Sequence, residues 1–416
     1  MPQITLQSCR EAKFVQKNWF IVSTLLLSHS MIYLSNSVVV PMLTTIAKDM
    51  NVAVSVAGIV STISMLVTGI TLLCSNLLQK AMKPQWIVVV AILLNIISNF
   101  TISQTNHFIV LLIFRAFVGI SLGMISFSTI SLITIWLSPD KRGYYLTVQT
   151  AINTMCVFLA SRVTIPLMQM LKRGWKGVFS LMALLGAIAL TLWLLSLRKL
   201  IADETAQATA SVKITKEKGL WVIKQKNLLL LCLFLALVSC AHIAVTTYLA
   251  AYLEISRGLP VAKAATYLGY ISLAGMFGGS MASLLSTKLG KRKPVLLLGV
   301  TGAMLSFLLI VNVTSEIALT IVVLLYGFFG IAYQPITQII TTELWDNAPD
   351  LASLAYSISF SIAYLATLFT PLIMTTALKF MSMQAAMYLF IGIYFLTCVS
   401  ALFMKETGPK AKLKKI

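Results

Sequence analysis

The chain is a succession of long apolar runs separated by short polar connections. A helix rises about 1.5 Å per residue, so a run of about 18 apolar residues crosses a hydrocarbon core of about 30 Å. The runs predict twelve transmembrane helices, at residues 19–43, 52–78, 86–103, 107–137, 144–171, 178–197, 228–253, 264–287, 294–313, 316–342, 351–378 and 384–404.

One connection, at 198–227, is long, polar and basic, and it lies at the midpoint of the chain. It separates six predicted helices from six others. We therefore predict an N-terminal six-helix half at 1–197, a cytoplasmic linker at 198–227 and a C-terminal six-helix half at 228–416.

The two halves carry related segments at a nearly constant spacing. Ser75–Lys83, after the second helix, is similar to Ser283–Arg292, after the eighth, at a shift of 208 residues. Gly119 in the fourth helix and Gly327 in the tenth are separated by the same 208 residues. Duplicated halves are typical of secondary transporters. The predicted fold class is an all-α integral membrane protein with twelve transmembrane helices in two pseudo-symmetric six-helix halves.

Composition and charge agree with a lipid environment. Hydrophobic residues make up 58% of the chain and charged residues 11%, whereas soluble domains carry about 25% charged residues. The net charge of +20 comes from short basic clusters between apolar runs, so we expect no nucleic-acid partner. With the N-terminus in the cytoplasm, cytoplasmic segments hold 23 of the 32 Lys and Arg and outer loops hold 7. This positive-inside pattern predicts a multi-pass cell-membrane protein with both termini cytoplasmic.

The loops after helices 2 and 8 resemble a motif of the major facilitator superfamily, and the resemblance extends over nearly the whole chain. The family's loop between helices 2 and 3 reads Gly-x-x-x-Asp-Arg-x-Gly-Arg-Arg. The second copy has Thr287 at the acidic position and keeps four other positions, Lys288, Gly290, Lys291 and Arg292. In the first copy the two glycines and the aspartate are replaced by Ser75, Met82 and Gln79.

Other segments carry the same resemblance. Arg115 is followed four residues later by Gly119, as in the family's helix 4, and Gly174–Phe179 resembles the family just before helix 6. The end of helix 1, Val38–Met50, resembles the branch that exports drugs and related metabolites. The resemblance implies the major facilitator fold, in which helices 1 and 7 line a central cavity, and transport of a small molecule.

Ionisable residues inside predicted helices are functional candidates, because a charged group is costly in lipid. No carboxylate lies near the middle of a predicted helix, but His29 in helix 1 and His242 in helix 7 do. Imidazole titrates near neutral pH, so proton binding at these residues could be exchanged for substrate binding. The alternative is that each histidine makes an interhelical hydrogen bond and keeps its charge state.

Two arginines and four amides complete the candidate substrate and coupling residues. Arg115 in helix 4 could pair with an anionic substrate group, or it could bond to backbone carbonyls of a neighbouring helix. Arg162 lies near the outer surface, where snorkelling also accounts for it. Two amide pairs at four-residue spacing would each present one polar helix face to a water-filled cavity: Gln149 and Asn153 in helix 5, and Gln334 and Gln338 in helix 10.

The two loop motifs supply candidates for a conformational latch between the halves. They are Lys80, Lys83, Lys288, Gly290, Lys291 and Arg292. Because both acidic positions of the motif are missing, we expect charge-paired latching to be weak.

The sequence predicts a secondary transporter rather than an enzyme. It contains no phosphate-binding loop, no His-Glu-x-x-His and no Gly-x-Ser-x-Gly run, and we expect no cofactor or metal. We predict a monomer that exports a small organic solute, a drug-like compound or an anionic metabolite such as a siderophore, with protons as a candidate coupling ion. The alternatives are an organic-anion importer of the same superfamily and a non-transporting membrane sensor.

Overall fold

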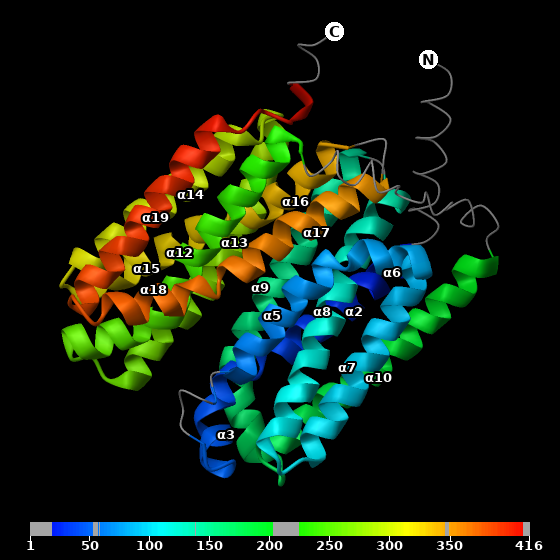
Figure 1. Ribbon diagram of the computed structural model, residues 1–416, viewed down its shortest axis with the longest axis horizontal. Coiled ribbons are helices and arrows are strands. Elements are labelled where there is room, and N and C mark those ends of the chain that lie inside the picture. Colours follow the sequence, from blue (N-terminus) through cyan, green and yellow to red (C-terminus); the bar gives the residue numbers. More distant parts are fainter. Residues whose placement is uncertain are drawn as a thin grey trace. The chain divides into compact units, whose positions relative to one another are not determined.

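The computed structural model describes residues 19–52, 57, 59–137, 139–202, 224–345 and 349–410, and every regular element in these ranges is a helix (Figure 1). The elements are α2 (Trp19–Ser37), η1 (Val40–Met42), α3 (Leu43–Asp49), α5 (Ile59–Leu73), α6 (Ser75–Ala81), α7 (Pro84–Gln104), α8 (Phe108–Trp136), α9 (Pro139–Met170), α10 (Trp175–Ala202), α12 (Lys226–Arg257), α13 (Val261–Leu289), α14 (Lys293–Asn312), α15 (Glu316–Gly330), α16 (Tyr333–Glu343), α17 (Pro349–Ala366), α18 (Phe369–Ala377) and α19 (Met383–Phe403).

The described helices confirm an all-helical membrane protein. Within the described ranges, eleven spans are long and apolar enough to cross a membrane, and Ile59–Leu73 is a shorter apolar helix in the predicted span 52–78. The helix is the natural form for these runs, because it satisfies each backbone donor and acceptor without water.

Four of the predicted spans are interrupted rather than continuous. Helix 2 divides into α5 and α6 at Cys74, and each of the other three interruptions lies one turn before a proline. Helix 1 breaks after Ser37 and continues through η1 and α3 to Asp49; helix 10 divides into α15 and α16, and helix 11 into α17 and α18. A proline has no amide hydrogen to donate to the carbonyl four residues earlier. Pro41, Pro335 and Pro371 stand four residues after Ser37, Ile331 and Thr367, where the helices are interrupted.

The connection between the two sets of spans is shorter than the predicted linker at both of its ends. Helix α10 continues to Ala202 and α12 begins at Lys226, so residues 198–202 and 226–227 are helical. Residues 203–223 lie outside the described part of the chain. We refer to the ends of the spans nearest this connection as the linker side, and to the other ends as the far side.

Tertiary contacts divide the chain into two compact units. Of the described residues, unit 1 comprises those within 1–145, 159–219 and 345–357, and unit 2 comprises those within 146–158, 220–344 and 358–416. Unit 1 therefore includes the first part of α17, and unit 2 includes a middle part of α9. The predicted division into halves at the linker stays a prediction.

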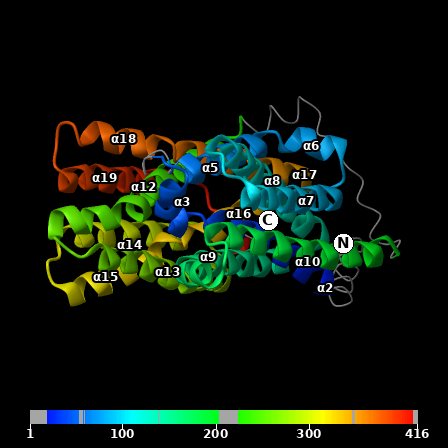
Figure 2. The same ribbon diagram turned by 90° about the horizontal axis from the view of Figure 1, so that it is seen from below.

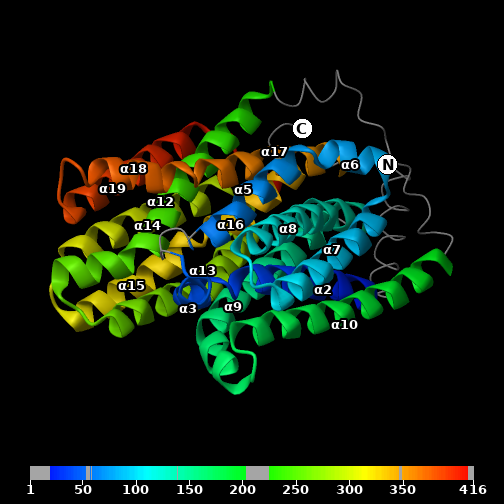
Figure 3. The same ribbon diagram turned by 60° about the horizontal axis from the view of Figure 1, so that its bottom comes forward.

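The same four helix pairings build the interior of both units. In unit 1, α7 packs on α8 and α10, α8 on α5, and α10 on α2 (Figure 3). In unit 2, α14 packs on α15 and α19, α15 on α13, and α19 on α12 (Figure 2). Counted as transmembrane helices, each pairing in unit 2 is the unit 1 pairing moved on by six, as expected for a duplicated architecture.

Gly119 and Gly327, the glycines related by 208 residues, stand at equivalent helix crossings. A Cβ at Gly119 would lie 2.4 Å from the Ser64 carbonyl oxygen, and a Cβ at Gly327 would lie 2.4 Å from that of Ile271. Small residues let helix backbones approach this closely in a membrane. Both glycines therefore permit close packing of the fourth helix of a half on the second.

We expect Gly119→Ala to destabilise the protein, because its added Cβ overlaps backbone that cannot move without separating α5 from α8. Overpacking of this kind costs about 1–3 kcal/mol. The measurement is the thermal unfolding temperature of the purified protein in detergent. Gly392→Ala is the matched control, since a Cβ at Gly392 in α19 meets nothing within 4 Å. Equal unfolding temperatures for the two variants would contradict the close crossing.

Candidate functional site

Arg115 is fully buried in unit 1 and holds three helices together. Its Nε donates to the Val60 carbonyl of α5 at 3.2 Å, and its Nη2 donates to the Ser64 hydroxyl of the same helix at 2.8 Å. Towards α2, Nη1 and Nη2 donate to the carbonyls of Ser35 and Asn36 at 3.4 and 3.3 Å, and Nη2 also reaches the Asn36 side chain at 2.8 Å.

The position of these acceptors explains why a cation is tolerated here. Ser35 and Asn36 belong to the last turn of α2, whose carbonyls have no partner further along the helix. The C-terminal end of a helix carries partial negative charge, which a buried guanidinium balances. All five acceptors described for Arg115 are uncharged, so the structure gives Arg115 the carbonyl-binding role, and its role towards a substrate stays a prediction.

A second polar cluster continues from Arg115 into α7. The Ser35 hydroxyl donates to Asn99 at 3.0 Å, and the Asn99 amide donates to the Asn95 side-chain oxygen at 2.9 Å. Asn95 in turn donates to Ser121 of α8 at 3.4 Å. Asn95 and Asn99 were not among the predicted residues, although their four-residue spacing is the same signal that singled out the amides of helices 5 and 10.

His29 is buried near the middle of α2 and is 2% exposed. Its Nδ1 lies 3.2 Å from the Thr129 hydroxyl of α8, and its ring stacks on Tyr33 with centroids 6.5 Å apart. A hydroxyl can donate to or accept from a ring nitrogen, so this contact is compatible with either tautomer.

His242 belongs to an aromatic cluster in unit 2. Its Nδ1 lies 3.1 Å from the Tyr326 hydroxyl, which lies 2.8 Å from the Tyr394 hydroxyl. The His242 and Tyr326 rings stack with centroids 6.0 Å apart, and Tyr333 meets the imidazole edge to face at 6.5 Å. The chain His242–Tyr326–Tyr394 links α12, α15 and α19 by hydrogen bonds next to the interruption of helix 10.

The predicted amides lie in the segments assigned to unit 2. Gln149 and Gln338 are buried, and Asn153 and Gln334 are half-buried. The Gln338 side-chain oxygen is buried and has no hydrogen-bond partner in the described part of the chain. An unpaired buried amide oxygen is costly, so it is a position where a donor group of a substrate would be favoured. Arg162 is exposed on α9, and its position near the membrane surface stays a prediction.

The second loop motif forms an ionic network on the linker side of unit 2. Arg292 is buried and donates to Glu343, at the end of α16, with Nη2 2.6 Å from Oε1. Glu406, beyond α19, accepts from the backbone N–H groups of Arg292 and Lys293, at 2.6 and 3.1 Å, at the start of α14. Thr407 completes the connection by donating its hydroxyl to Glu343 at 3.1 Å.

Each loop motif also makes a contact between uncharged groups. In unit 1, Gln79 donates from its amide nitrogen to the Ser353 hydroxyl of α17 at 3.0 Å. In unit 2, the hydroxyls of Thr147 in α9 and Ser283 in α13 are hydrogen-bonded. Both contacts join the N-terminal and C-terminal parts of the sequence on the linker side, and Gln79 stands at the acidic position of the first motif.

The sequence model of the protein family Major Facilitator Superfamily matches residues 25–360, which are more than three quarters of the chain. The chain belongs to the major facilitator superfamily. It is therefore a secondary transporter that works by alternating access, and not an enzyme. No curated protein matches it.

Solved structures of major facilitator proteins share its fold. The proton:xylose symporter XylE bound to 6-bromo-6-deoxy-D-glucose is 14% identical with a TM-score of 0.76, covering 94% of this chain and 96% of XylE. The transporter FucP in the outward conformation is 13% identical with a TM-score of 0.72, covering 92% and 98%. The E. coli fucose:proton symporter FucP is 12% identical with a TM-score of 0.70, covering 94% and 99%. At these identities the likeness shows the fold alone.

The latch candidates of this major facilitator protein differ in burial and in their contacts. Arg292 is engaged in the ionic network, and Gly290, at φ 64°, ends α13 in the left-handed conformation that glycine adopts without strain. The remaining candidates have exposed side chains: Lys80, Lys83, Lys288 and Lys291. Their part in latching stays a prediction, and Gln79 and Ser283 are the residues of the two motifs that make the uncharged contacts with Ser353 and Thr147.

We expect Glu343→Gln to lower the unfolding temperature markedly. The substitution removes the carboxylate paired with Arg292, whose side chain is only 7% exposed, and breaking a buried ion pair costs roughly 3 kcal/mol. The measurement is thermal unfolding in detergent. Glu254→Gln is the control, because Glu254 is exposed at the far end of α12. An unfolding temperature unchanged by Glu343→Gln would show that the network does not stabilise the fold.

Proposed function

We propose that this major facilitator protein exports a small neutral or anionic organic solute in exchange for protons. The observation that carries the proposal is the charge pattern of the spans. Acidic residues of the described helices stand only in first or last turns, namely Asp49, Asp140, Glu254, Glu316, Glu343 and Asp350. Arg115, in contrast, is fully buried inside α8.

This pattern disfavours a cationic substrate. A buried guanidinium without a carboxylate partner contributes positive potential that water does not screen. The partial negative charge at the end of α2 offsets only about half of an elementary charge, and the interiors of the described helices hold no carboxylate to attract a cation. An anion would be attracted by the positive potential that remains, and a neutral solute could use uncharged groups such as Gln338.

Proton coupling is supported by the two histidines. His29 and His242 lie in the interior of α2 and α12, the first helix of each half, and each bonds to a hydroxyl group. Histidine is the side chain whose proton affinity lies closest to physiological pH. The solved relatives XylE and FucP are described as proton symporters, so the same fold couples solute movement to protons elsewhere.

Export is supported by the segment that resembles the efflux branch, Val38–Met50, which contacts the start of helix 6 in the structure. The Trp175 indole, at the start of α10, donates to the Asp49 carboxylate, at the end of α3, at 2.6 Å. This bond fixes the extension of helix 1 to helix 6 on the far side of unit 1. With both termini in the cytoplasm, as the basic residues predict, the far side faces outward. We also propose that the protein acts as a monomer and lies in the cell membrane.

Uptake is the second candidate. The specific observation in its favour is that XylE and FucP are symporters, which carry solute and proton in the same direction. The two candidates share the histidines and differ only in the direction of solute movement relative to the proton gradient.

We expect His242→Gln to abolish the response of transport to an imposed pH gradient while leaving solute exchange at equal pH largely intact. Glutamine keeps a hydrogen bond to Tyr326 but cannot be protonated. The measurement is solute flux in proteoliposomes with and without the gradient, and His29→Gln is tested in parallel. His107→Gln is the control, since His107 lies in the connection before α8. A full gradient response in the double variant His29→Gln/His242→Gln would exclude histidine coupling.

Direction and substrate charge are tested together in inverted membrane vesicles energised by a proton gradient. Export predicts that anionic or neutral compounds accumulate inside inverted vesicles and that cationic dyes of similar size do not. Accumulation in right-side-out vesicles instead would establish uptake. Preferential movement of cationic dyes would contradict the inference from Arg115.

A further inference from the structure

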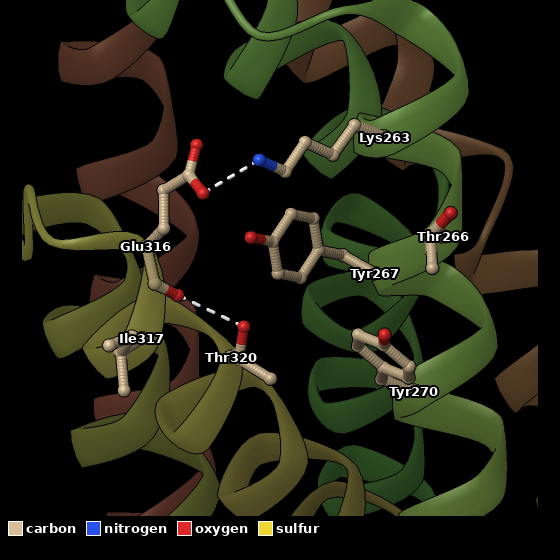
Figure 4. A pocket seen from close by; sticks show the side chains of 7 residues that line it. All are labelled: Lys263, Thr266, Tyr267, Tyr270, Glu316, Ile317 and Thr320. Atoms are coloured by element: carbon tan, nitrogen blue, oxygen red, sulfur yellow. Dashed lines mark hydrogen bonds and ion pairs between the residues drawn. The ribbon is translucent and has the colours of Figure 1, made fainter.

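A small cavity lies on the far side of unit 2, between the first turns of α13 and α15. Its volume is about 210 Å³. The side chains that line it are Lys263, Thr266, Tyr267, Tyr270, Glu316, Ile317 and Thr320 (Figure 4). The membrane spans of the two helices begin at Thr266 and Glu316, so the cavity stands at the level where a span enters the bilayer.

The cavity exists because the two helices touch deeper in the membrane and separate towards their ends. A Cβ on Gly278 of α13 would lie 1.8 Å from the Phe328 carbonyl oxygen of α15, which leaves no space at that crossing. Beyond the crossing, Tyr267 and Tyr270 fill part of the opening, with ring centroids 5.9 Å apart. Figure 4 shows the Tyr267 ring projecting from α13 towards α15 beside the ion pair at the mouth.

The mouth presents both signs of charge. Lys263 Nζ lies 2.6 Å from Glu316 Oε2, and the two side chains are 47% and 55% exposed. The hydrogen bond to Glu316 raises the pKa of Lys263, so the ammonium stays protonated at physiological pH. The ion pair uses one of the three ammonium hydrogens of Lys263 and one of the two carboxylate oxygens of Glu316. The other hydrogens and the other oxygen can form hydrogen bonds to a ligand.

An apolar stripe runs from the cavity along α15. Ile317, Ile321 and Leu325 follow at four-residue spacing, and they are 77%, 54% and 42% exposed. Residues four apart share one helix face, so these side chains form a continuous exposed strip that leads from the charged mouth towards the middle of the span. In a membrane this strip contacts lipid tails.

We propose that the cavity binds the headgroup of a zwitterionic phospholipid that carries a primary ammonium. Phosphatidylethanolamine is the lipid with this headgroup chemistry. Lys263 contacts the phosphate, the free oxygen of Glu316 accepts from the lipid ammonium, and the tyrosine rings cover that ammonium. One acyl chain follows the Ile317–Leu325 stripe. Tyrosines and lysines at span ends are the groups that anchor a membrane protein at the lipid–water interface.

The test is native mass spectrometry of the purified full chain released from detergent with phosphatidylethanolamine or phosphatidylglycerol of identical acyl chains. We expect the wild-type protein to retain phosphatidylethanolamine preferentially. Glu316→Gln should lower that retention roughly two- to fivefold, the effect of an exposed ionic contact, and should remove the preference over phosphatidylglycerol. Lys263→Gln should lower retention of both lipids, because both carry the phosphate.

Matched controls are Glu254→Gln and Lys379→Gln, which change exposed charges outside the cavity on the same side of the protein. Ile321→Ser leaves the ion pair intact and removes part of the stripe, so it should also lower lipid retention. A variant is compared with the wild-type protein only if its unfolding temperature, measured without added lipid, is unchanged. If Lys263→Gln does not fold, Lys263→Arg takes its place, and this variant should retain the lipid because it keeps the positive charge.

Two outcomes would overturn the proposal. One is wild-type retention and selectivity in both Glu316→Gln and Ile321→Ser. The other is displacement of the lipid by an equal concentration of soluble phosphoethanolamine, which would assign the cavity to a soluble zwitterion without acyl chains. Failure of the lipid test leaves the transport proposal standing, because transport is measured by solute flux and rests on other residues.

Discussion

In lipid every polar group must find its partner inside the protein, and this constraint governs the whole structure. It makes each apolar run a helix, and it determines how the few polar side chains are placed. Arg115 shows the constraint most clearly, since it is fully buried yet donates to five acceptors at the ends and edges of α2 and α5. A cation in the membrane thereby becomes a connection between three helices.

The two units meet the constraint with the same helix pairings but different chemistry. Unit 1 uses an arginine, amides and hydroxyls that bond to one another and to backbone carbonyls. Unit 2 uses the hydrogen-bonded aromatic chain from His242 through Tyr326 to Tyr394. Interhelical hydrogen bonds in membranes are worth about 0.6 kcal/mol on average, so each unit gains its cohesion from many of them and from close packing at Gly119 and Gly327. A duplicated scaffold has therefore kept its packing while its polar residues diverged.

The linker side combines one strong and several weak connections. The Arg292–Glu343 pair and Glu406 tie three separate parts of unit 2 together by charge-assisted bonds. The contacts of Gln79 with Ser353 and of Thr147 with Ser283 are between uncharged groups. Each of these contacts lies within one unit, Gln79–Ser353 in unit 1 and Thr147–Ser283 in unit 2, so the neutral contacts and the ionic network alike stabilise single units.

Span number, span order, the duplication and the family follow from the sequence, because the length and apolarity of a run determine whether it crosses lipid. The interruptions at Ser37, Ile331 and Thr367 each precede a proline by four residues, but Pro166 lies within the continuous helix α9, so proline marked where a span could break and the tertiary structure decided where it did. The partners of Arg115 could not be predicted from the sequence, because backbone carbonyls such as those of Val60 and Asn36 leave no trace in residue identity. For the same reason only the tertiary structure joined Glu406 to Arg292 and Tyr394 to His242: each pair is far apart in the chain, and contact between them depends on how the helices pack.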